Sequence, residues 1–403
     1  AVAGNTMTSS TEARNKTLWI VRTFMERIRR QGGADGEVIP WGPTVYPTRT
    51  KDAANSGQHP QIDCFPFPSP TLHFSLLPTI SKETDVPHFD VFNGDADGIC
   101  ALHQLRLADP RESTLITGAK RDINLLRRVQ AQAGDTVTVL DISLDKNRDD
   151  LGRLLDAGVR VDYFDHHFAG EIPDSPNLTA TIDTAGDVCT GLLVNRFLKS
   201  AFLPWAVTAL FGDNLHDAAR TAAEPLNLDA SQLQQLETLG TLLNYNGYGS
   251  KLEDLYFAPD DLYRKIKPYA DPFDFIASDK TFEALHNGFE SDMNRASSIA
   301  PVLETEHCAV FSFPDESFSR RVSGVYSNQL ARDNPHRAHA LASLLPSGEY
   351  LVSVRAPLDT KTGADELCRK FPTGGGRQAA AGINELPADQ FQAFLDAIQE
   401  QFR

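Results

Sequence analysis

The sequence predicts an α/β protein in which a parallel-sheet domain is followed by a helical connector and a smaller α/β domain. Apolar strand-like segments alternate with amphipathic helical segments from residue 88, a long helical stretch follows over about 187–299, and strands return near residue 303. Strands that alternate with helices imply right-handed crossovers and a parallel sheet. We therefore expect an irregular N-terminal extension (1–86), a first α/β domain (87–230), a helical connector (231–302) and a second α/β domain (303–403). The substrate cleft is expected between the two α/β domains.

As far as residue 164, the first domain is expected to contain four strands and three helices. Strands are predicted over 88–92, 113–117, 136–140 and 159–164, because these short segments are rich in β-branched and aromatic residues. Helices are predicted over about 99–108, 122–133 and 146–157. The second helix has Ile123, Leu126 and Val129 on one face, and Gly134 and Gly158 follow the last two helices as C-terminal caps.

The rest of the chain is expected to be helical up to about residue 299, with breaks at Pro204, Pro268 and Pro272. Beyond residue 303, strands are predicted over 307–313 and 350–354, and helices over 323–332, 364–370 and 388–402.

The N-terminal 86 residues differ from the rest in being rich in Pro, Gly, Ser and Thr. One short amphipathic helix is predicted there, with Leu18, Val21, Met25 and Ile28 on one face. The arginines of this stretch also suggest an organellar transit peptide, but Glu12 and Glu26 do not fit that acid-poor pattern. We favour a flexible extension.

The composition restricts which classes of molecule the protein is expected to bind. A net charge of −16 argues against a broad grip on duplex DNA, which relies on many cationic side chains. No apolar run approaches the roughly 18 residues that a membrane span needs. The five cysteines lack paired spacing and predict free thiols in a reducing, cytoplasmic compartment, with Cys100 and Cys189 buried. Small or single-stranded anionic substrates are favoured, and a homodimer is a further expectation.

Polar clusters follow three of the predicted strands. They are Asn93-Gly-Asp95-Ala-Asp97, then Asp141, then Asp165-His166-His167. In an open parallel sheet, ligands bind outside the carboxyl ends of the strands, so these side chains are expected in one crevice. Asp95 and Asp97 are two residues apart and, in an extended segment, would project to the same side. Such a concentration of negative charge requires a cation, and mixed carboxylate and imidazole ligands favour Mn²⁺ over Mg²⁺.

Each cluster has a simpler interpretation when taken alone. The first partly matches a calcium-binding loop, but its twelfth position is Gln104 instead of Glu, and a strand precedes it. Asp141 alone is typical of a loop-capping residue. The third cluster alone is typical of a surface turn or of a histidine pair with local partners. Their coincidence at three strand ends favours a metal centre.

The same residues resemble the motifs of the DHH phosphoesterase superfamily. Asp95-Ala-Asp97-Gly98, Asp141 and Asp165-His166-His167 are similar to its first three motifs, and Asp213 in Leu210-Phe-Gly-Asp213-Asn is similar to the fourth. The C-terminal region resembles the DHH-associated domain, through Val322-Ser-Gly-Val-Tyr, Val352-Ser-Val-Arg355 and the glycine-rich segment 374–382. The resemblance covers about residues 88–403.

The resemblance implies two Mn²⁺ ions that share a hydroxide nucleophile. One ion would be held by Asp95 and Asp141 with Asn93, and the other by Asp97, His166 and Asp213 with Asp141 bridging. His167 would face the substrate phosphate, and Asp165 would orient the imidazoles. Two positions depart from the family pattern: Asn93 stands where many relatives have a His or Asp ligand, and Arg377 replaces the His of a Gly-Gly-Gly-His motif.

The glycine run is the predicted substrate-binding element. Gly374, Gly375 and Gly376 would let backbone amides converge on a phosphate, while Arg377 and Arg355 would bind a second phosphate or stack on a base. The alternative is a flexible hairpin with solvated arginines. Two weaker candidates are the turn over 244–249, for which a structural role is equally expected, and Thr190, for which a core-facing role is more expected.

The resemblance suggests hydrolysis of phosphodiester bonds in short oligoribonucleotides or dinucleotides, or of nucleotide phosphomonoesters. An exopolyphosphatase or pyrophosphatase is the alternative enzyme. A non-catalytic nucleotide-binding protein is the alternative from another class, motivated by Asn93 and Arg377.

Overall fold

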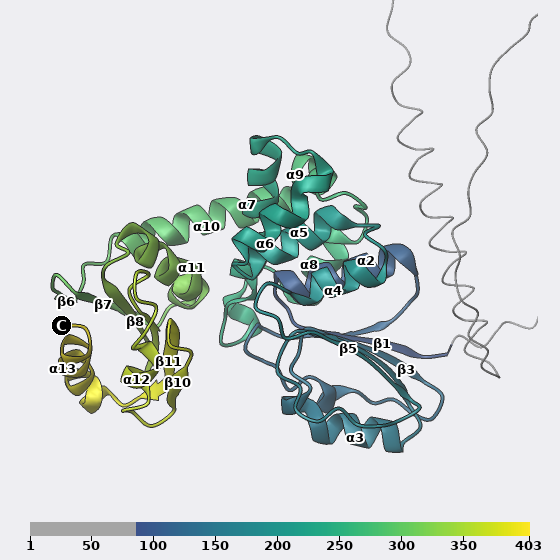
Figure 1. Ribbon diagram of the computed structural model, residues 1–403, viewed down its shortest axis with the longest axis horizontal. Coiled ribbons are helices and arrows are strands. Elements are labelled where there is room, and N and C mark those ends of the chain that lie inside the picture. Colours follow the sequence, from purple (N-terminus) through teal and green to yellow (C-terminus); the bar gives the residue numbers. More distant parts are fainter. Residues whose placement is uncertain (1–85) are drawn as a thin grey trace, which may run out of the picture. The chain divides into compact units, whose positions relative to one another are not determined.

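The computed structural model describes residues 86–403, which fold into an α/β protein with two sheets (Figure 1). The expected N-terminal extension, its short helix, the transit-peptide alternative and Cys64 lie outside the described residues, except for Val86 at the end of that extension. The α/β class predicted from the sequence is confirmed.

The first sheet is parallel and has the strand order β2-β1-β3-β4-β5. Its strands are β1 (His88–Phe92), β2 (Thr114–Ile116), β3 (Thr136–Leu140), β4 (Arg160–Asp165) and β5 (Leu178–Ile182). The first four were predicted. Sequence analysis missed β5, an edge strand whose side chains are exposed or only half-buried and therefore lack the apolar signature of an inner strand.

Helices cover both faces of this sheet (Figure 1). On one face lie α2 (Ala96–Ala108), α4 (Thr190–Phe197) and α5 (Leu203–Gly212), whose apolar side chains form a core with Phe92 and Leu140. On the other face, α3 (Arg148–Asp156) packs with Val91 and Val139. Successive residues of the inner strands therefore face opposite layers, and apolar helices pack against both of them.

The helix predicted over 122–133 is wrong. This segment contains only one short 3₁₀ turn, η1 (Leu126–Arg128), and Val129 already has extended backbone angles. The Arg153 guanidinium of α3 donates to the carbonyl oxygens of Leu126 and Val129 at 3.0 and 3.3 Å, and the Asn147 side chain accepts from the Leu126 amide. These side chains satisfy backbone groups that helical bonds would otherwise have used. The helix predicted over 146–157 is confirmed as α3, preceded by η2 (Asp145–Asn147).

The region between the two sheets is helical, as predicted. After α5, its elements are α6 (His216–Ala223), η3 (Glu224–Leu226), α7 (Ala230–Gly247), η4 (Leu252–Asp254), α8 (Pro259–Ile266), α9 (Pro272–Ser278) and α10 (Lys280–Ser297). Pro204 and Pro272 stand in the first turns of α5 and α9, and Pro268 follows α8, so each marks a helix boundary.

The second sheet is mixed and has the order β10-β11-β9-β8-β7-β6. Its strands are β6 (Leu303–Glu304), β7 (Cys308–Phe313), β8 (Ala338–Leu344), β9 (Tyr350–Arg355), β10 (Gly374–Gly376) and β11 (Ala380–Leu386), with α11 (Ser317–Asp333), α12 (Ala364–Cys368), η5 (Ala388–Gln390) and α13 (Phe391–Gln401). The strands predicted over 307–313 and 350–354 and all three predicted helices are found. Strand β8 was missed because its sequence is rich in alanine, which gives no strand signal.

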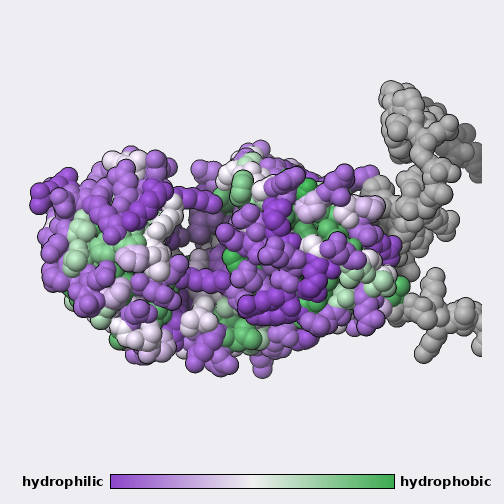
Figure 2. All heavy atoms as spheres, turned by 90° about the horizontal axis from the view of Figure 1, so that it is seen from below, coloured by the Kyte–Doolittle hydropathy of each residue, from purple (hydrophilic) through white to green (hydrophobic). Residues whose placement is uncertain are grey.

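Apolar side chains from α7, α10, α11 and the second sheet meet in one cluster, which includes Tyr245, Ala296 and Val322. Cys100, Cys189, Cys308 and Cys368 are buried free thiols, as predicted for the first two. Within residues 86–403, no helix combines the length and apolarity that crossing a membrane requires. The face seen in Figure 2 is mainly hydrophilic, with separate apolar areas.

Candidate metal centre

Four strands of the first sheet end at the candidate site. Asp95 and Asp97 follow β1, Asp141 follows β3, and His166 follows β4, while Lys120 follows β2. The chain leaves β1 toward β2 on one side and continues with β3 on the other, so the strand order reverses between β1 and β3. Such a switch point is where open parallel sheets bind ligands.

Asp95 and Asp97 lie at the start of a helix, not in the extended segment that we expected. Asp95 is the N-cap of α2, and its Oδ1 accepts hydrogen bonds from the amides of Asp97 and Gly98 at 3.1 and 3.2 Å. Asp97 is in the first turn, where the helix dipole favours a carboxylate. A side chain at Gly98 would place its Cβ 2.2 Å from the Asn93 carbonyl oxygen, so only glycine allows this tight strand-to-helix turn.

The Asp97 carboxylate is held by the N-terminus of α4. Its Oδ2 accepts from the amide of Thr190 and its Oδ1 from that of Gly191, both at 2.7 Å. A Cβ at Gly191 would lie 2.6 Å from that of Ala209, which explains glycine at this position. Each carboxylate oxygen can accept two bonds, so Asp97 retains lone pairs for a metal ion.

His166 has the hydrogen bond that prepares an imidazole for metal binding. Its Nδ1 donates to the Val188 carbonyl oxygen at 2.9 Å, which leaves the lone pair on Nε2. Nε2 lies 3.4 Å from Asp141 Oδ1 and 3.5 Å from Asp213 Oδ2. These three residues are far apart in the sequence, and the fold brings them together.

His167 is paired with Asp165. Its Nδ1 donates to Asp165 Oδ1 at 2.7 Å, and its ring lies against that of His166, with centroids 4.5 Å apart. Burial opposes a charge on this imidazole, but the bond to Asp165 and the surrounding carboxylates outweigh burial and raise the pKa of His167. Asp165 thus contacts one imidazole of the pair, and the other is oriented by Val188.

Asp141 has an unusual backbone and a crowded carboxylate. Its φ of 59° lies in the left-handed region, which is uncommon for a residue other than glycine. The Thr190 hydroxyl donates to its Oδ1 at 3.2 Å. Burial, and then the negative charges of Asp97 and Asp95, raise the pKa of Asp141 well above its usual range.

Asp213 is affected in the same way. Burial raises its pKa to about 6, with Lys120 opposing the shift and Asp97 adding to it. Buried carboxylates that raise one another's pKa form a repulsive cluster, and a cation removes that repulsion.

Two sets of side chains among residues 86–403 have the geometry to hold a metal ion. One is Asp141, His166 and His167, and the other is Asp97, His166 and Asp213; within each set the ligand atoms lie within 4.8 Å of one another. His166 belongs to both. Carboxylate oxygens with imidazole nitrogen suit a transition metal such as Mn²⁺, so the donor set fits the ion that the sequence suggested.

Two of the expected ligands are not in these sets. Asp95 Oδ2 instead accepts a bond from the Lys120 ammonium at 2.5 Å. Asn93 is buried, and its Nδ2 donates to the Lys120 carbonyl oxygen at 3.4 Å, while its Oδ1 has no hydrogen-bond partner within the described part of the chain. The carboxyl groups of Asp95 and Asp141 lie within hydrogen-bond reach of each other, and the first of the two expected metal sites stays a prediction.

Sequence analysis missed Lys120 and Arg121, although a signal was present. The strand over 113–117 was predicted, and the segment Gly118-Ala-Lys120-Arg121 comes directly after it, so the strand-end argument applied there too. The segment predicted as a turn over 244–249 is instead the C-terminal end of α7 as far as Gly247. Its Asn244 Oδ1 accepts a bond from the Lys120 ammonium at 2.8 Å. That segment thus contacts the site.

The glycine run forms strand β10, which pairs antiparallel with β11, so the expected nest of converging amides is not formed. In a strand successive amides point in opposite directions. A Cβ at Gly374 would lie 1.8 Å from the Cys368 carbonyl oxygen, which gives this glycine a steric reason. Gly375 and Gly376 lie in the same strand, and Arg377 is exposed at the turn of this hairpin, as in the alternative considered above.

Arg355 lies at the end of β9. Its Nε donates to Asn328 Oδ1 at 2.8 Å, and Asn328 Nδ2 in turn donates to the Oδ1 of Asn214, the residue after Asp213. Burial lowers the pKa of Arg355; Tyr248 opposes this shift and Arg121 adds to it. Two hydrogen bonds through Asn328 therefore connect Arg355 to Asn214, the neighbour of the candidate metal ligand Asp213.

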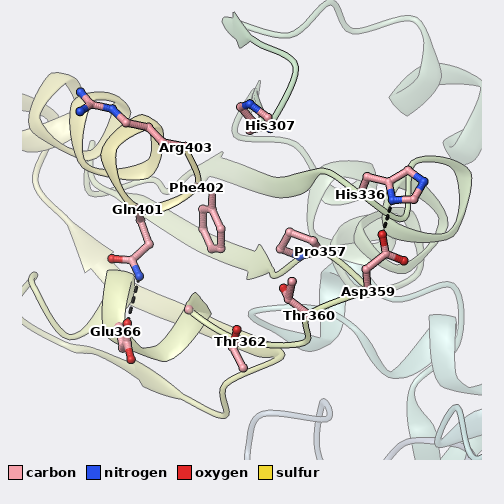
Figure 3. A pocket seen from close by; sticks show the side chains of 11 residues that line it. His307, His336, Pro357, Asp359, Thr360, Thr362, Glu366, Gln401, Phe402 and Arg403 are labelled. Atoms are coloured by element: carbon pink, nitrogen blue, oxygen red, sulfur yellow. Dashed lines mark hydrogen bonds and ion pairs between the residues drawn. The ribbon is translucent and has the colours of Figure 1, made fainter.

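Two cavities lined by residues of the described part of the chain are large enough for a small ligand. One, of about 410 Å³, is lined by Asn214, His216, Arg220 and Asn328 among others, and so begins beside Asp213. The other, of about 360 Å³, is lined only by residues of the range 307–403, with His336 and Asp359 paired at its edge (Figure 3). The second cavity contains none of the candidate metal ligands.

The fold and the site together define an α/β protein with an acidic, histidine-containing centre that could hold a metal ion. No family model matches the chain, and no curated protein matches it by sequence. Among solved structures, it is similar to the exonuclease RecJ bound to manganese, with a TM-score of 0.54 and 16% identity over 78% of this chain and 89% of that one.

Two further solved structures are similar at lower TM-scores. The RecJ–Mn²⁺ complex from Thermus thermophilus has a TM-score of 0.47 and 18% identity, over 78% of this chain and 51% of that one. The pGpG-specific phosphodiesterase PggH from Vibrio cholerae has a TM-score of 0.46 and 12% identity, over 78% and 98%. At 16% identity, the likeness to manganese-bound RecJ shows that the two chains share their fold.

Proposed function

We propose that this protein is a metal-dependent phosphoesterase of the DHH type that hydrolyses phosphodiester bonds in short oligoribonucleotides or dinucleotides. The observation that carries the proposal is the orientation of His166. Its Nδ1 donates a hydrogen bond to the Val188 carbonyl oxygen, and its Nε2 lies 3.4 Å from Asp141 and 3.5 Å from Asp213. An imidazole oriented in this way among buried carboxylates is prepared to bind a metal ion.

A divalent ion at this centre would act as a Lewis acid on a phosphoryl oxygen and lower the pKa of a water molecule. The protein's own groups have separate tasks. Asp97, His166 and Asp213 would hold the ion, and the amides of α4 keep Asp97 in place. His167, with its raised pKa and its bond to Asp165, is suited to donating a hydrogen bond or a proton to an oxygen of the phosphate ester.

Two guanidinium groups support an anionic substrate. Arg121 and Arg355 interact unfavourably, and neither forms an ion pair with a carboxylate among residues 86–403. A phosphate would neutralise both, because guanidinium groups bind phosphate oxygens in a bidentate manner. The bonds from Arg355 through Asn328 to Asn214 link this pair to the residue beside Asp213. The neighbouring cavity of about 410 Å³ is within the size range of small-ligand sites.

The net charge of −16 favours short substrates over long nucleic acids. Within residues 86–403, the two uncompensated arginines provide local positive charge, which suffices for one or two phosphates. We therefore propose a small phosphorylated partner, neither duplex DNA nor a membrane, with Mn²⁺ as the ion.

The proposal is tested by hydrolysis of a dinucleotide and a short oligoribonucleotide in the presence of Mn²⁺. We expect mononucleotide release by the wild type and a loss of at least about 100-fold for His166→Ala, since even groups that only support a metal ligand are worth 10–100-fold. His336→Ala, which changes a mostly exposed histidine of the other cavity, is the matched control and should retain activity. A His166→Ala protein as active as the wild type would refute the proposal.

The alternative enzyme, an exopolyphosphatase or pyrophosphatase, differs in having no need to recognise a base. Phe168 follows the histidine pair and is 73% exposed, so it is available to stack on a base. Phe168→Ala should weaken hydrolysis of a dinucleotide and leave that of polyphosphate unchanged. Turnover of polyphosphate alone would favour the alternative enzyme, and nucleotide binding without any turnover would favour a non-catalytic binder.

A further inference from the structure

Lys120 lies where a second cation would be expected. Its ammonium nitrogen is 2.5 Å from Asp95 Oδ2, 2.8 Å from Asn244 Oδ1 and 3.6 Å from Asp213 Oδ1. Three oxygen atoms from three elements, two of them carboxylate oxygens, therefore surround this nitrogen. This is the kind of oxygen environment that a divalent ion would also use.

The backbone and the surroundings fix Lys120 in this position. Its amide donates to the Gly247 carbonyl oxygen at 2.8 Å, and its own carbonyl accepts from Asn93 Nδ2. The Tyr248 ring lies 5.5 Å from the ammonium group, within the range of a cation–π contact. A Cβ at Gly247 would be 3.0 Å from that of Asp95, so the end of α7 is packed directly against the acidic residue. Packing and hydrogen bonds therefore hold Lys120 beside Asp95, which a freely moving surface lysine would not show.

Asp95 has little capacity left for a metal ion. Its Oδ1 accepts two backbone amides, and its Oδ2 accepts the ammonium group. A carboxylate offers about four lone-pair positions, so one remains. An ion at that position would lie directly beside the ammonium group, and two cations at such a separation repel each other strongly.

The remaining acids are arranged differently. Asp97, Asp213 and Asp141 belong, with the two histidines, to the overlapping ligand sets. Asp95 belongs to neither set, although its carboxyl group lies within hydrogen-bond reach of that of Asp141. His166 is a member of both ligand sets, so the two sets lie in one region. One region of this kind suits a single ion better than two separate ions. Asn93 has a neutral side chain and provides no negative charge for a second ion.

We propose that the Lys120 ammonium group replaces one of the two metal ions of the two-metal arrangement, so that the chain binds a single divalent ion at the His166 side of the centre. Lys120 is then a built-in cation that balances Asp95 and part of Asp213. The inference rests on the proposed function for the existence of the first ion, but it concerns the number of ions and not the reaction.

The test is a count of bound Mn²⁺. The full chain is equilibrated with Mn²⁺, freed of excess ion by gel filtration, and analysed for manganese per chain and by electron paramagnetic resonance. The wild type should bind one ion and give the six-line spectrum of an isolated Mn²⁺. Lys120→Ala should bind two, with the broadened signal of two ions coupled at short distance. Lys146→Ala, a lysine exposed by 63% in the same half of the molecule, is the matched control and should bind one.

Lys120→Gln provides a second variant if Lys120→Ala does not fold, because the amide can still bond to Asn244. It too should gain an ion. Two ions in the wild type, or one ion in both folded Lys120 variants, would overturn the inference. One bound ion without any hydrolysis would refute the proposed function and leave this inference standing, whereas hydrolysis with two coupled ions would do the reverse. A wild type that binds no Mn²⁺ would refute both.

Discussion

Replacing Thr190 by Val tests how the α4 N-terminus supports the metal centre. The Thr190 hydroxyl donates to Asp141 Oδ1 at 3.2 Å, and the amide of the same residue donates to Asp97 Oδ2 at 2.7 Å. Valine keeps the shape of the side chain and the backbone amide. Thr190→Val therefore removes one hydrogen bond to one carboxylate and leaves the bond to the other.

The expected effect follows from the position of Asp141. Its backbone is in the left-handed region, and its carboxylate is buried against other acids. The Thr190 hydroxyl is the side-chain donor that orients it toward His166. The loss of a group that supports a metal ligand costs about 10–100-fold in metal affinity, which corresponds to about 1.4–2.7 kcal/mol.

The assay is Mn²⁺ titration by calorimetry together with urea unfolding of the metal-free protein. Thr208→Val is the matched control, because Thr208 is also fully buried and donates to a carbonyl oxygen, that of Pro204, within its own helix. Both variants should lose a similar, small amount of unfolding free energy, about 1 kcal/mol for one hydrogen bond. Only Thr190→Val should bind Mn²⁺ more weakly.

Wild-type Mn²⁺ affinity in both Thr190→Val and Thr208→Val would refute the role of the Thr190 hydroxyl. An equal loss of affinity in both variants would refute it as well, since the effect would then reflect general destabilisation and not the bond to Asp141.

Two further predictions concern stability. Burial lowers the pKa of His103 from its ordinary value of 6.5 to about 4, against the opposing effect of its bond to the Tyr269 carbonyl oxygen. The unfolded chain therefore takes up the proton at a higher pH than the folded chain, and the free energy of unfolding should fall by about 3 kcal/mol as the pH drops from 6.5 to 4. In urea unfolding at several pH values, His103→Gln should flatten this part of the stability profile. An unchanged slope in the variant would contradict the assignment to His103. Gly374→Ala places a Cβ 1.8 Å from a carbonyl oxygen and should lower the free energy of unfolding by about 1–3 kcal/mol. Gly375→Ala is the control, because a Cβ there meets nothing within 4 Å, and it should change the free energy of unfolding by less than about 0.5 kcal/mol. Equal shifts of the melting temperature in the two variants would argue against the packing of this strand.

Local patterns in the sequence were sufficient for the α/β class, four strands of the parallel sheet and most helices. Strands β3 and β4 each bury most of their residues, including Val139, Tyr163 and Phe164, so their apolar composition identified them. The edge strand β5 and the alanine-rich β8 escaped detection because neither has that signature. The helix expected over 122–133 failed because the side chains of Arg153 and Asn147, which come from elsewhere in the chain, satisfy the backbone of that segment.

The sequence by itself also determined which residues could form an acidic centre, because the carboxyl ends of parallel strands must meet at one edge. It did not determine their partners. That His166 uses Nδ1 for Val188, that Asp97 is held by α4, and that Lys120 and Asn244 enclose Asp95 depend on contacts between segments up to 124 residues apart. Only the tertiary structure decides such contacts, because side-chain spacing within one element carries no information about which distant element packs against it.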